Sequence, residues 1–170
     1  MQLVITSQNT GTLETWRGVF SEFPSEFPSE FPGVTFQAAL RAETPVDAVL
    51  MAGVFAFERY GGRPEFDRAQ ILENHRGDGW PELVIVPPSR PTVRNSDGEW
   101  SVRPEYAEIK PAYYAASHTF QAVTEWNEGH EKPVATIEIN LPLLDMDNPS
   151  DESSAQSFRT ALAEHTRKSR

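Results

Sequence analysis

The chain has 170 residues and a formal net charge of −10, from 25 acidic and 15 basic side chains, and it contains no cysteine. The length suits a single domain, residues 1–170, that is large enough for a hydrophobic core. The negative charge argues against nucleic acid and anionic membranes as partners, because both are bound through dense lysine and arginine, and the absence of cysteine excludes disulfides and cysteine-ligated metals.

Targeting and metal signals are missing from the sequence. The first residues, MQLVITSQNTG, carry neither a basic stretch nor a long apolar run, so we expect no signal peptide and a cytoplasmic protein. No segment approaches membrane-spanning length. The four histidines (His75, His118, His130 and His165) are scattered without metal-ligand spacing, so we expect no metal site, and nothing indicates a cofactor.

Strands and helices alternate along the predicted chain. The apolar patterns predict strands at residues 3–6, 34–38, 48–52, 83–86, 106–110 and 135–141. They predict helices at residues 12–20, 66–75, 111–126 and 155–165, with Thr12 capping the first. This alternation favours a mostly parallel sheet covered by helices on both faces, a three-layer α/β/α fold.

Two segments interrupt this pattern. Residues 21–32 repeat Ser-Glu-Phe-Pro three times, and a proline at every fourth position forbids a regular helix. We interpret the repeat as a tandem duplication that lengthens a surface loop; a proline-rich docking motif is the alternative. Residues 89–105 form a polar excursion, with a hairpin predicted around residues 95–98.

Parallel sheets bind ligands beyond the carboxyl ends of their strands. This rule selects residues 7–11, 53–62, 87–90 and 142–148, together with Lys110. We expect residues 53–62 to be a loop that closes on Gly61 and Gly62, where backbone can approach a ligand closely because no Cβ intervenes.

Four segments carry a resemblance to a known family: Val-Asp-Ala-Val at 46–49, Gly-Gly at 61–62, Val-Ile-Val-Pro at 84–87 and Ile-Asn-Leu-Pro at 139–142. Together with the order of the elements, they make nearly the whole chain resemble a macrodomain. The resemblance implies the three-layer fold described above and binding of ADP-ribose or a related nucleotide. It also implies that such a site can hydrolyse an ADP-ribosyl bond.

The chain departs from the family pattern at positions that bear on function. Residues 39–41 are Ala-Leu-Arg where the family has an acidic residue that holds adenine, and Val54 stands where many hydrolytic members have asparagine. Residues 46–62 contain no lysine, which another class uses for catalysis. The second phosphate loop, 142–148, has two carboxylates and no glycine.

Candidate site residues follow from these segments. An aromatic wall is expected from Phe55, Phe57 and Tyr60, and cations for an anionic ligand from Arg90 and Lys110. The remaining ligand-binding candidates are Asn9, Gly53, Val54, Gly61, Gly62, Leu143 and Leu144. If the site is catalytic, a base would activate water, and the candidates for it are Asp145, Asp147 and Glu58.

Three functions remain open at this point. The first is an ADP-ribose binder or ADP-ribosyl hydrolase with its small-molecule ligand in a cleft at the carboxyl ends of the strands. The second is the same fold recruited to a more apolar ligand or another reaction, since Val54, Leu143 and Leu144 make the cleft less polar. The third is a non-catalytic partner-binding or structural protein, with a collapsed cleft and the repeat loop at 21–32 as its contact with an unidentified protein.

Overall fold

The computed structural model describes residues 1–21, 33–65, 67–144 and 152–168. The repeat at 21–32, apart from Ser21, and the candidate bases Asp145 and Asp147 lie outside these ranges. The strands are β1 (Gln2–Thr6), β2 (Val34–Gln37), β3 (Ala48–Leu50), β4 (Gln70–Glu73), β5 (Leu83–Val86), β6 (Thr92–Arg94), β7 (Trp100–Val102) and β8 (Thr136–Asn140). The helices are α1 (Thr10–Ser21), α2 (Gly53–Tyr60), α3 (Pro111–Gly129) and α4 (Glu152–Lys168), with short 3-10 turns η1 (Pro104–Tyr106) and η2 (Leu141–Leu143).

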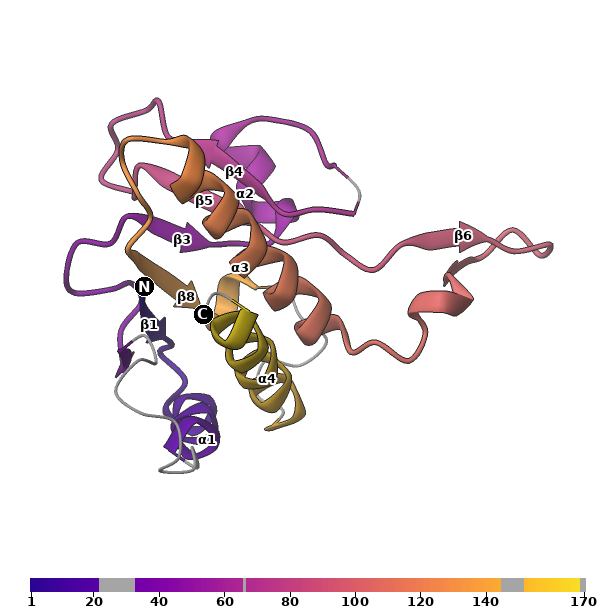
Figure 1. The fold of residues 1–170 in the computed structure, drawn as a ribbon, viewed down its shortest axis with the longest axis horizontal. Coiled ribbons are helices and arrows are strands. Elements are labelled where there is room, and N and C mark those ends of the chain that lie inside the picture. The colour runs from indigo at the N-terminus through magenta and orange to yellow at the C-terminus, as the bar shows by residue number, and fades with distance from the viewer. Residues whose placement is uncertain (22–32, 66, 145–151, 169–170) are drawn as a thin grey trace.

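Six of the strands form one sheet in the order β2-β1-β8-β3-β5-β4. All neighbours are parallel except β4, which runs antiparallel to β5 at one edge. The chain is therefore a mixed α/β protein with a mostly parallel six-stranded sheet, as the alternation of predicted strands and helices indicated (Figure 1).

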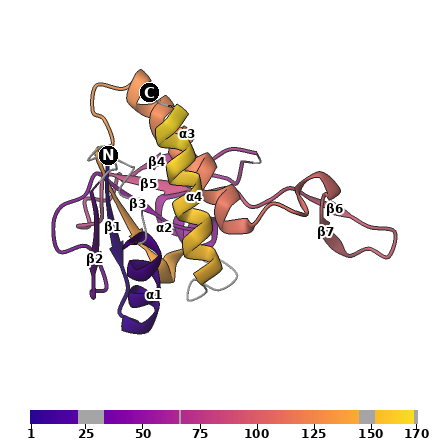
Figure 2. The same ribbon diagram turned by 60° about the horizontal axis from the view of Figure 1, so that its bottom comes forward.

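The two faces of the sheet have different covers. Helices α1, α3 and α4 pack on one face, where they bury the main core (Figure 2). The opposite face is covered by α2 together with loop residues such as Trp80. Alternation along β8 separates the two environments, because Ile137 and Ile139 join the helical core while Glu138 and Asn140 point to the other side.

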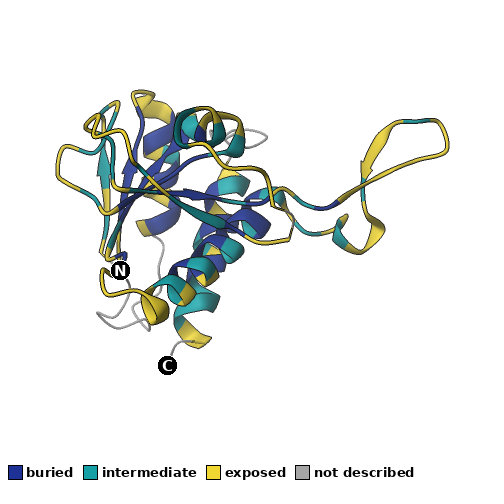
Figure 3. Cartoon of the chain, turned by 90° about the horizontal axis from the view of Figure 1, so that it is seen from above, coloured by how far each residue is buried: buried dark blue, intermediate teal, exposed yellow. Residues whose placement is uncertain are grey.

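Strands β6 and β7 form a separate antiparallel hairpin that projects from the body (Figures 1 and 3). It contains the turn predicted around residues 95–98, in which Asn95 accepts the Gly98 N–H through its backbone oxygen. We refer to residues 91–103 as the arm. Most of its residues are exposed (Figure 3).

The helix predicted at 66–75 is wrong, because β4 occupies residues 70–73. Ile71 packs against the helical core, whereas the next residue, Leu72, packs against the opposite cluster. Neighbouring residues on opposite faces are typical of a strand, and a run this short fits either period.

Two further predictions are corrected. Residues 53–60 form α2 instead of a loop, and Gly61 ends the helix with a positive φ of 78°. The strand predicted at 106–110 is absent: Pro104 begins η1, and the Ile109 N–H donates to the Tyr106 carbonyl in a turn. Two prolines, Pro104 and Pro111, flank this segment and favour turn and helix starts over a strand. None of the described helices is long and apolar enough to cross a bilayer.

Candidate functional site

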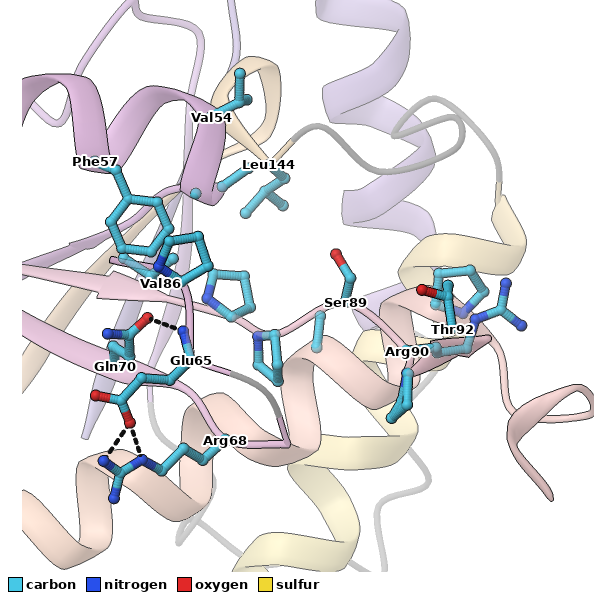
Figure 4. A pocket seen from close by; sticks show the side chains of 18 of the residues that line it. Val54, Phe57, Glu65, Arg68, Gln70, Val86, Ser89, Arg90, Thr92 and Leu144 are labelled. Atoms are coloured by element: carbon cyan, nitrogen blue, oxygen red, sulfur yellow. Dashed lines mark hydrogen bonds and ion pairs between the residues drawn. The ribbon is translucent and has the colours of Figure 1, made fainter. Parts of the chain in front are cut away.

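A cavity of about 810 Å³ opens at the carboxyl ends of three neighbouring parallel strands (Figure 4). Gly53 lines it just after β3, Val86 at the end of β5, and Leu144 four residues after β8. Gln70 comes from the start of the antiparallel β4. Cavities of roughly 300–1,000 Å³ at this edge of an α/β sheet are typical small-molecule sites.

Most of the cavity wall is hydrocarbon. Val54 and Phe57 come from α2, and in Figure 4 Val86 lies beside Phe57 and Leu144 lies beside Val54. Five prolines complete this part of the wall: Pro64, Pro87, Pro88, Pro91 and Pro111. Val54 is 62% exposed, so the rim of the cavity presents apolar surface to solvent. Such a wall suits the flat or apolar part of a ligand.

Gly53 allows the first turn of α2 to lie against Phe57. A Cβ at this position would be 2.7 Å from Cε2 of the Phe57 ring and 3.6 Å from Cγ1 of Val86. The aromatic wall therefore takes its place because position 53 has no side chain.

Two helices begin at the cavity. The first turn of α2 contributes Gly53 and Val54, and the first turn of α3 contributes Pro111. Neither N-cap residue, Ala52 or Lys110, forms a side-chain capping bond. The first N–H groups of a helix have no intrahelical acceptor and carry a partial positive charge, so this end of the cavity favours an anionic group.

One wall is braced by polar contacts in the segment before β4. Arg68 and Glu65 form an ion pair, and the Glu65 N–H donates to Oε1 of Gln70 at 3.0 Å (Figure 4). Nε2 of Gln70 donates to the Arg63 carbonyl at 2.9 Å. Gln70 thus holds residues 63–65 against the start of β4, and the Arg68 charge is partly neutralised by Glu65.

Arg90 contributes its side chain to the cavity wall and its guanidinium to the fold. Nη1 donates to the carbonyls of Ile109 at 2.9 Å and Ala107 at 3.4 Å. These hydrogen bonds hold the segment before α3 against residues 87–90, which follow β5.

Five of the residues predicted from the sequence line this cavity: Gly53, Val54, Phe57, Arg90 and Leu144. Phe55 and Glu58 lie on the exposed side of α2. Tyr60 and Leu143 pack into the second core cluster, and Gly61 and Gly62 follow α2 with positive φ values of 78° and 96° outside the wall.

Asn9 and Lys110 have partners within the fold. Oδ1 of Asn9 accepts the Thr12 N–H at 3.0 Å, which makes Asn9 the cap that was predicted for Thr12. Nζ of Lys110 donates to Oγ of Ser153 at 2.9 Å and lies beside a smaller, separate cavity between α3 and α4.

Ser89 lies in the selected segment 87–90, but several other wall residues were missed by sequence reasoning: Glu65, Arg68, Gln70, Thr92, Val102 and Ala115. Arg68 and Gln70 come from the segment for which a helix is predicted, and Thr92 and Val102 come from the arm. The one available signal was the strand-ending Pro87-Pro88, which marks the edge where Ser89 and Thr92 follow.

A second polar cluster surrounds Glu138, whose side chain is fully buried. Its Oε1 accepts hydrogen bonds from the Thr6 hydroxyl and the Ala42 N–H, each at 3.0 Å, and from Asn140 at 3.2 Å. Its Oε2 accepts Nε of Arg41 at 2.9 Å. A buried carboxylate needs this many donors to offset its lost hydration, so Glu138 fixes the segment around residue 41 on the sheet.

Trp80 lies between two guanidinium groups next to this cluster. The guanidinium carbons of Arg41 and Arg59 lie 3.8 and 4.1 Å from the centre of its rings. Arg59 also pairs with Asp78 at 2.8 Å, and the Asn74 side chain, which hydrogen-bonds Asp78, lowers the pKa of that carboxyl. Both arginines are thus committed to carboxylates and to the indole, which is a structural arrangement.

Two titratable side chains on α3, the helix that begins at the cavity, have pKa values that are shifted by burial. Desolvation lowers the pKa of His118, and nearby Asp67 opposes this shift. Tyr114 contacts His118, with ring centres 4.4 Å apart, and burial raises the pKa of Tyr114. The imidazole is therefore favoured in its neutral form.

In the described part of the chain, no group of three or more His, Cys, Asp or Glu side chains is arranged to hold a metal ion. The site thus consists of an apolar cavity, two helix N-termini and a bordering ion pair.

No protein-family model matches this sequence, and no curated protein matches it.

Proposed function

We propose that this chain is a divergent macrodomain that binds ADP-ribose or a related nucleotide in the cavity beyond β3, β5 and β8. The observation that carries this proposal is where the resembling segments lie. Residues 46–49, 84–87 and 139–142 belong to or border three strands that are adjacent in the sheet, and their carboxyl ends meet at the cavity.

The cavity offers complementary contacts to the two parts of such a ligand. A diphosphate would lie at the first turn of α2, near the N–H groups of Gly53 and Val54. A ribose or base would lie against Phe57, Leu144 and the prolines. The apolar character of the wall favours a nucleotide held by helix dipoles and packing over one held by ion pairs.

Cleavage of an ADP-ribosyl bond would require a base. In that reaction a water attacks the anomeric carbon, and a carboxylate accepts its proton. Asp145 directly follows the cavity residue Leu144 in the sequence, Asp147 comes two residues later, and both are our candidates. Glu58 lies on the exposed side of α2 and does not line the cavity.

The test is calorimetric titration of the full chain with ADP-ribose. We expect micromolar binding that is lost in Val54→Glu, because the new carboxylate repels the diphosphate at the start of α2. The helix itself tolerates an acidic residue in its first turn. Val93→Glu is the matched control, since Val93 is also exposed but does not line the cavity. The absence of any heat of binding at millimolar ADP-ribose would contradict the proposal.

A second candidate is a more apolar anion, such as an aromatic or aliphatic carboxylate. It is favoured by the exposed Val54 beside Phe57 and Leu144, which gives the cavity a largely hydrocarbon wall. Displacement of a fluorescent naphthalene sulfonate from the cavity distinguishes the two. ADP-ribose displaces the probe under the first proposal, and only the hydrophobic carboxylate does so under the second.

A further inference from the structure

The arm presents side chains that the body of the protein does not cover. Thr92, Val93 and Arg94 on β6 are exposed, and Trp100 on β7 is 70% exposed (Figure 3). An isolated two-stranded hairpin is only marginally stable in water. Because the arm also exposes a tryptophan, we expect another protein surface to pack against it.

One face of the arm combines an aromatic group with a cation. Trp100 is directly paired with Arg94, so the two side chains share a face, and Val93 and Ser101 share the other. Thr92 and Val102 are on the same face as Trp100, and both line the mouth of the cavity. The Trp100 face therefore begins at the cavity and continues outward along the arm.

Helix α2 presents a matching surface at the same cavity mouth. Val54 is 62% exposed and Phe55 is 39% exposed, and Glu58 is exposed one turn further along the helix. Within the described residues, neither Glu58 nor Arg94 takes part in an ion pair. Nε of Arg94 donates to the Gly98 carbonyl within the arm at 3.0 Å, which holds the guanidinium in place without neutralising its charge. One surface thus offers an aromatic ring and a cation without an ion-pair partner, and the other offers apolar side chains and a carboxylate without one.

We propose that a second copy of this chain covers the arm, with Trp100 and Arg94 of each copy packed on Val54, Phe55 and Glu58 of the other. Charge complementarity supports this partner. The arm has no net charge, because Arg94 and Arg103 balance Asp97 and Glu99, so the arm meets an acidic copy with little repulsion, and the Arg94–Glu58 pair supplies the attraction. Both surfaces border the cavity mouth, so a two-fold axis beside the mouth makes the contact reciprocal and closed. This dimer does not depend on the identity of the ligand.

Sedimentation equilibrium of the full chain over a range of concentrations tests the dimer. We expect a wild-type dimer whose dissociation constant rises by roughly tenfold or more in Trp100→Ala, because a buried tryptophan anchor dominates such contacts. Val93→Glu is the control: it lies on the other face of the arm and is expected to leave the dissociation constant unchanged. Circular dichroism checks that each variant keeps its fold.

A charge exchange identifies the contact itself. Glu58→Arg and Arg94→Glu each weaken the dimer by placing like charges together, and the double variant restores it. A wild-type chain that sediments as a monomer at every concentration overturns the proposal. So does a dimer that Trp100→Ala leaves unchanged, or a double variant as weak as the single ones.

Discussion

The two faces of the central sheet are stabilised by different interactions. The face beneath α1, α3 and α4 is apolar, and Trp16, Phe120 and Phe158 on it are almost completely buried. The other face has the eight-residue α2 and loops as its cover; it buries a smaller apolar cluster that includes Val49 and Val84, and it also buries the ionisable Glu138. A layer of long helices excludes water through hydrocarbon alone, whereas loops need a polar side chain that satisfies their backbone.

The two faces should therefore differ in how the loss of a side chain lowers the free energy of unfolding. On the helical face the loss of a side chain leaves a cavity, and the cost follows the volume removed. On the loop face the loss of one acceptor leaves several donors unpaired, and the cost follows the number of hydrogen bonds.

Phe158→Ala is expected to lower the free energy of unfolding by about 3–5 kcal/mol. The ring is fully buried and contacts Trp16 and Phe120, with ring centres 5.5 and 6.0 Å away. Urea denaturation measures the change. Leu40→Ala is the control, since Leu40 is 65% exposed and should cost no more than about 0.5 kcal/mol. Equal costs would contradict the assignment of the core to the helical face.

Glu138→Gln is expected to cost about 1–3 kcal/mol, because an amide cannot replace the charged acceptor that Arg41 needs. Hydrogen exchange should also accelerate at the Ala42 N–H, which donates to this carboxylate. Glu82→Gln serves as the matched control, because Glu82 forms an exposed ion pair with Lys132 and contributes little. Unchanged exchange at Ala42 would show that Glu138 does not anchor this loop.

A pair of glycine substitutions compares the two layers directly. Gly53→Ala is expected to cost about 1 kcal/mol, because the added methyl forces the Phe57 ring out of the cavity wall. Gly18→Ala in α1 meets no atom within 4 Å and should stabilise the helix by about 0.5–1 kcal/mol. Thermal unfolding of both variants gives the signs. Two shifts in the same direction would refute the close packing at Gly53.

Acidification is expected to produce the smallest effect, and on the helical face. Burial lowers the pKa of His118 and His165 below their ordinary value of 6.5. As the pH falls through the unfolded-state pKa, the unfolded chain takes up protons before the folded chain does, so the free energy of unfolding decreases toward the lower folded-state pKa. The double variant His118→Gln, His165→Gln should flatten this slope in urea titrations. An unchanged slope would assign the pH dependence to other groups.

The sheet was predictable because its central strands are short apolar runs bounded by turns. Residues 83–86 and 136–140 were placed correctly, since buried parallel strands have a simple sequence signature. The hairpin at 92–102 was also anticipated from its turn. The identity of β4 was not predictable, because Ile71 and Leu72 fit a helical or an extended pattern until their neighbours are known.

The sequence predicted the edge of the sheet at which the cavity opens, but only some of the residues that line the cavity. The rule for parallel sheets selected the strand ends, and Gly53, Val54, Phe57 and Leu144 follow from it. The contributions of Gln70 and Ala115 depend on how β4 and α3 pack, which is tertiary information. The role of Arg90 is similar, because its acceptors at residues 107 and 109 are carbonyls that no side-chain pattern reveals.

The pairing of β1 with β8 also bears on how the chain folds. Thr6 bonds to Glu138, 132 positions later in the sequence, and β8 lies between β1 and β3. Contacts between such distant segments slow folding, because the long intervening loop must close before they can form. During synthesis, β1 has no neighbour on its inner side until residues 136–140 have emerged. The inner edge of β1 therefore stays exposed while residues 7–135 are being synthesised, and an unpaired strand edge of this kind is prone to aggregation.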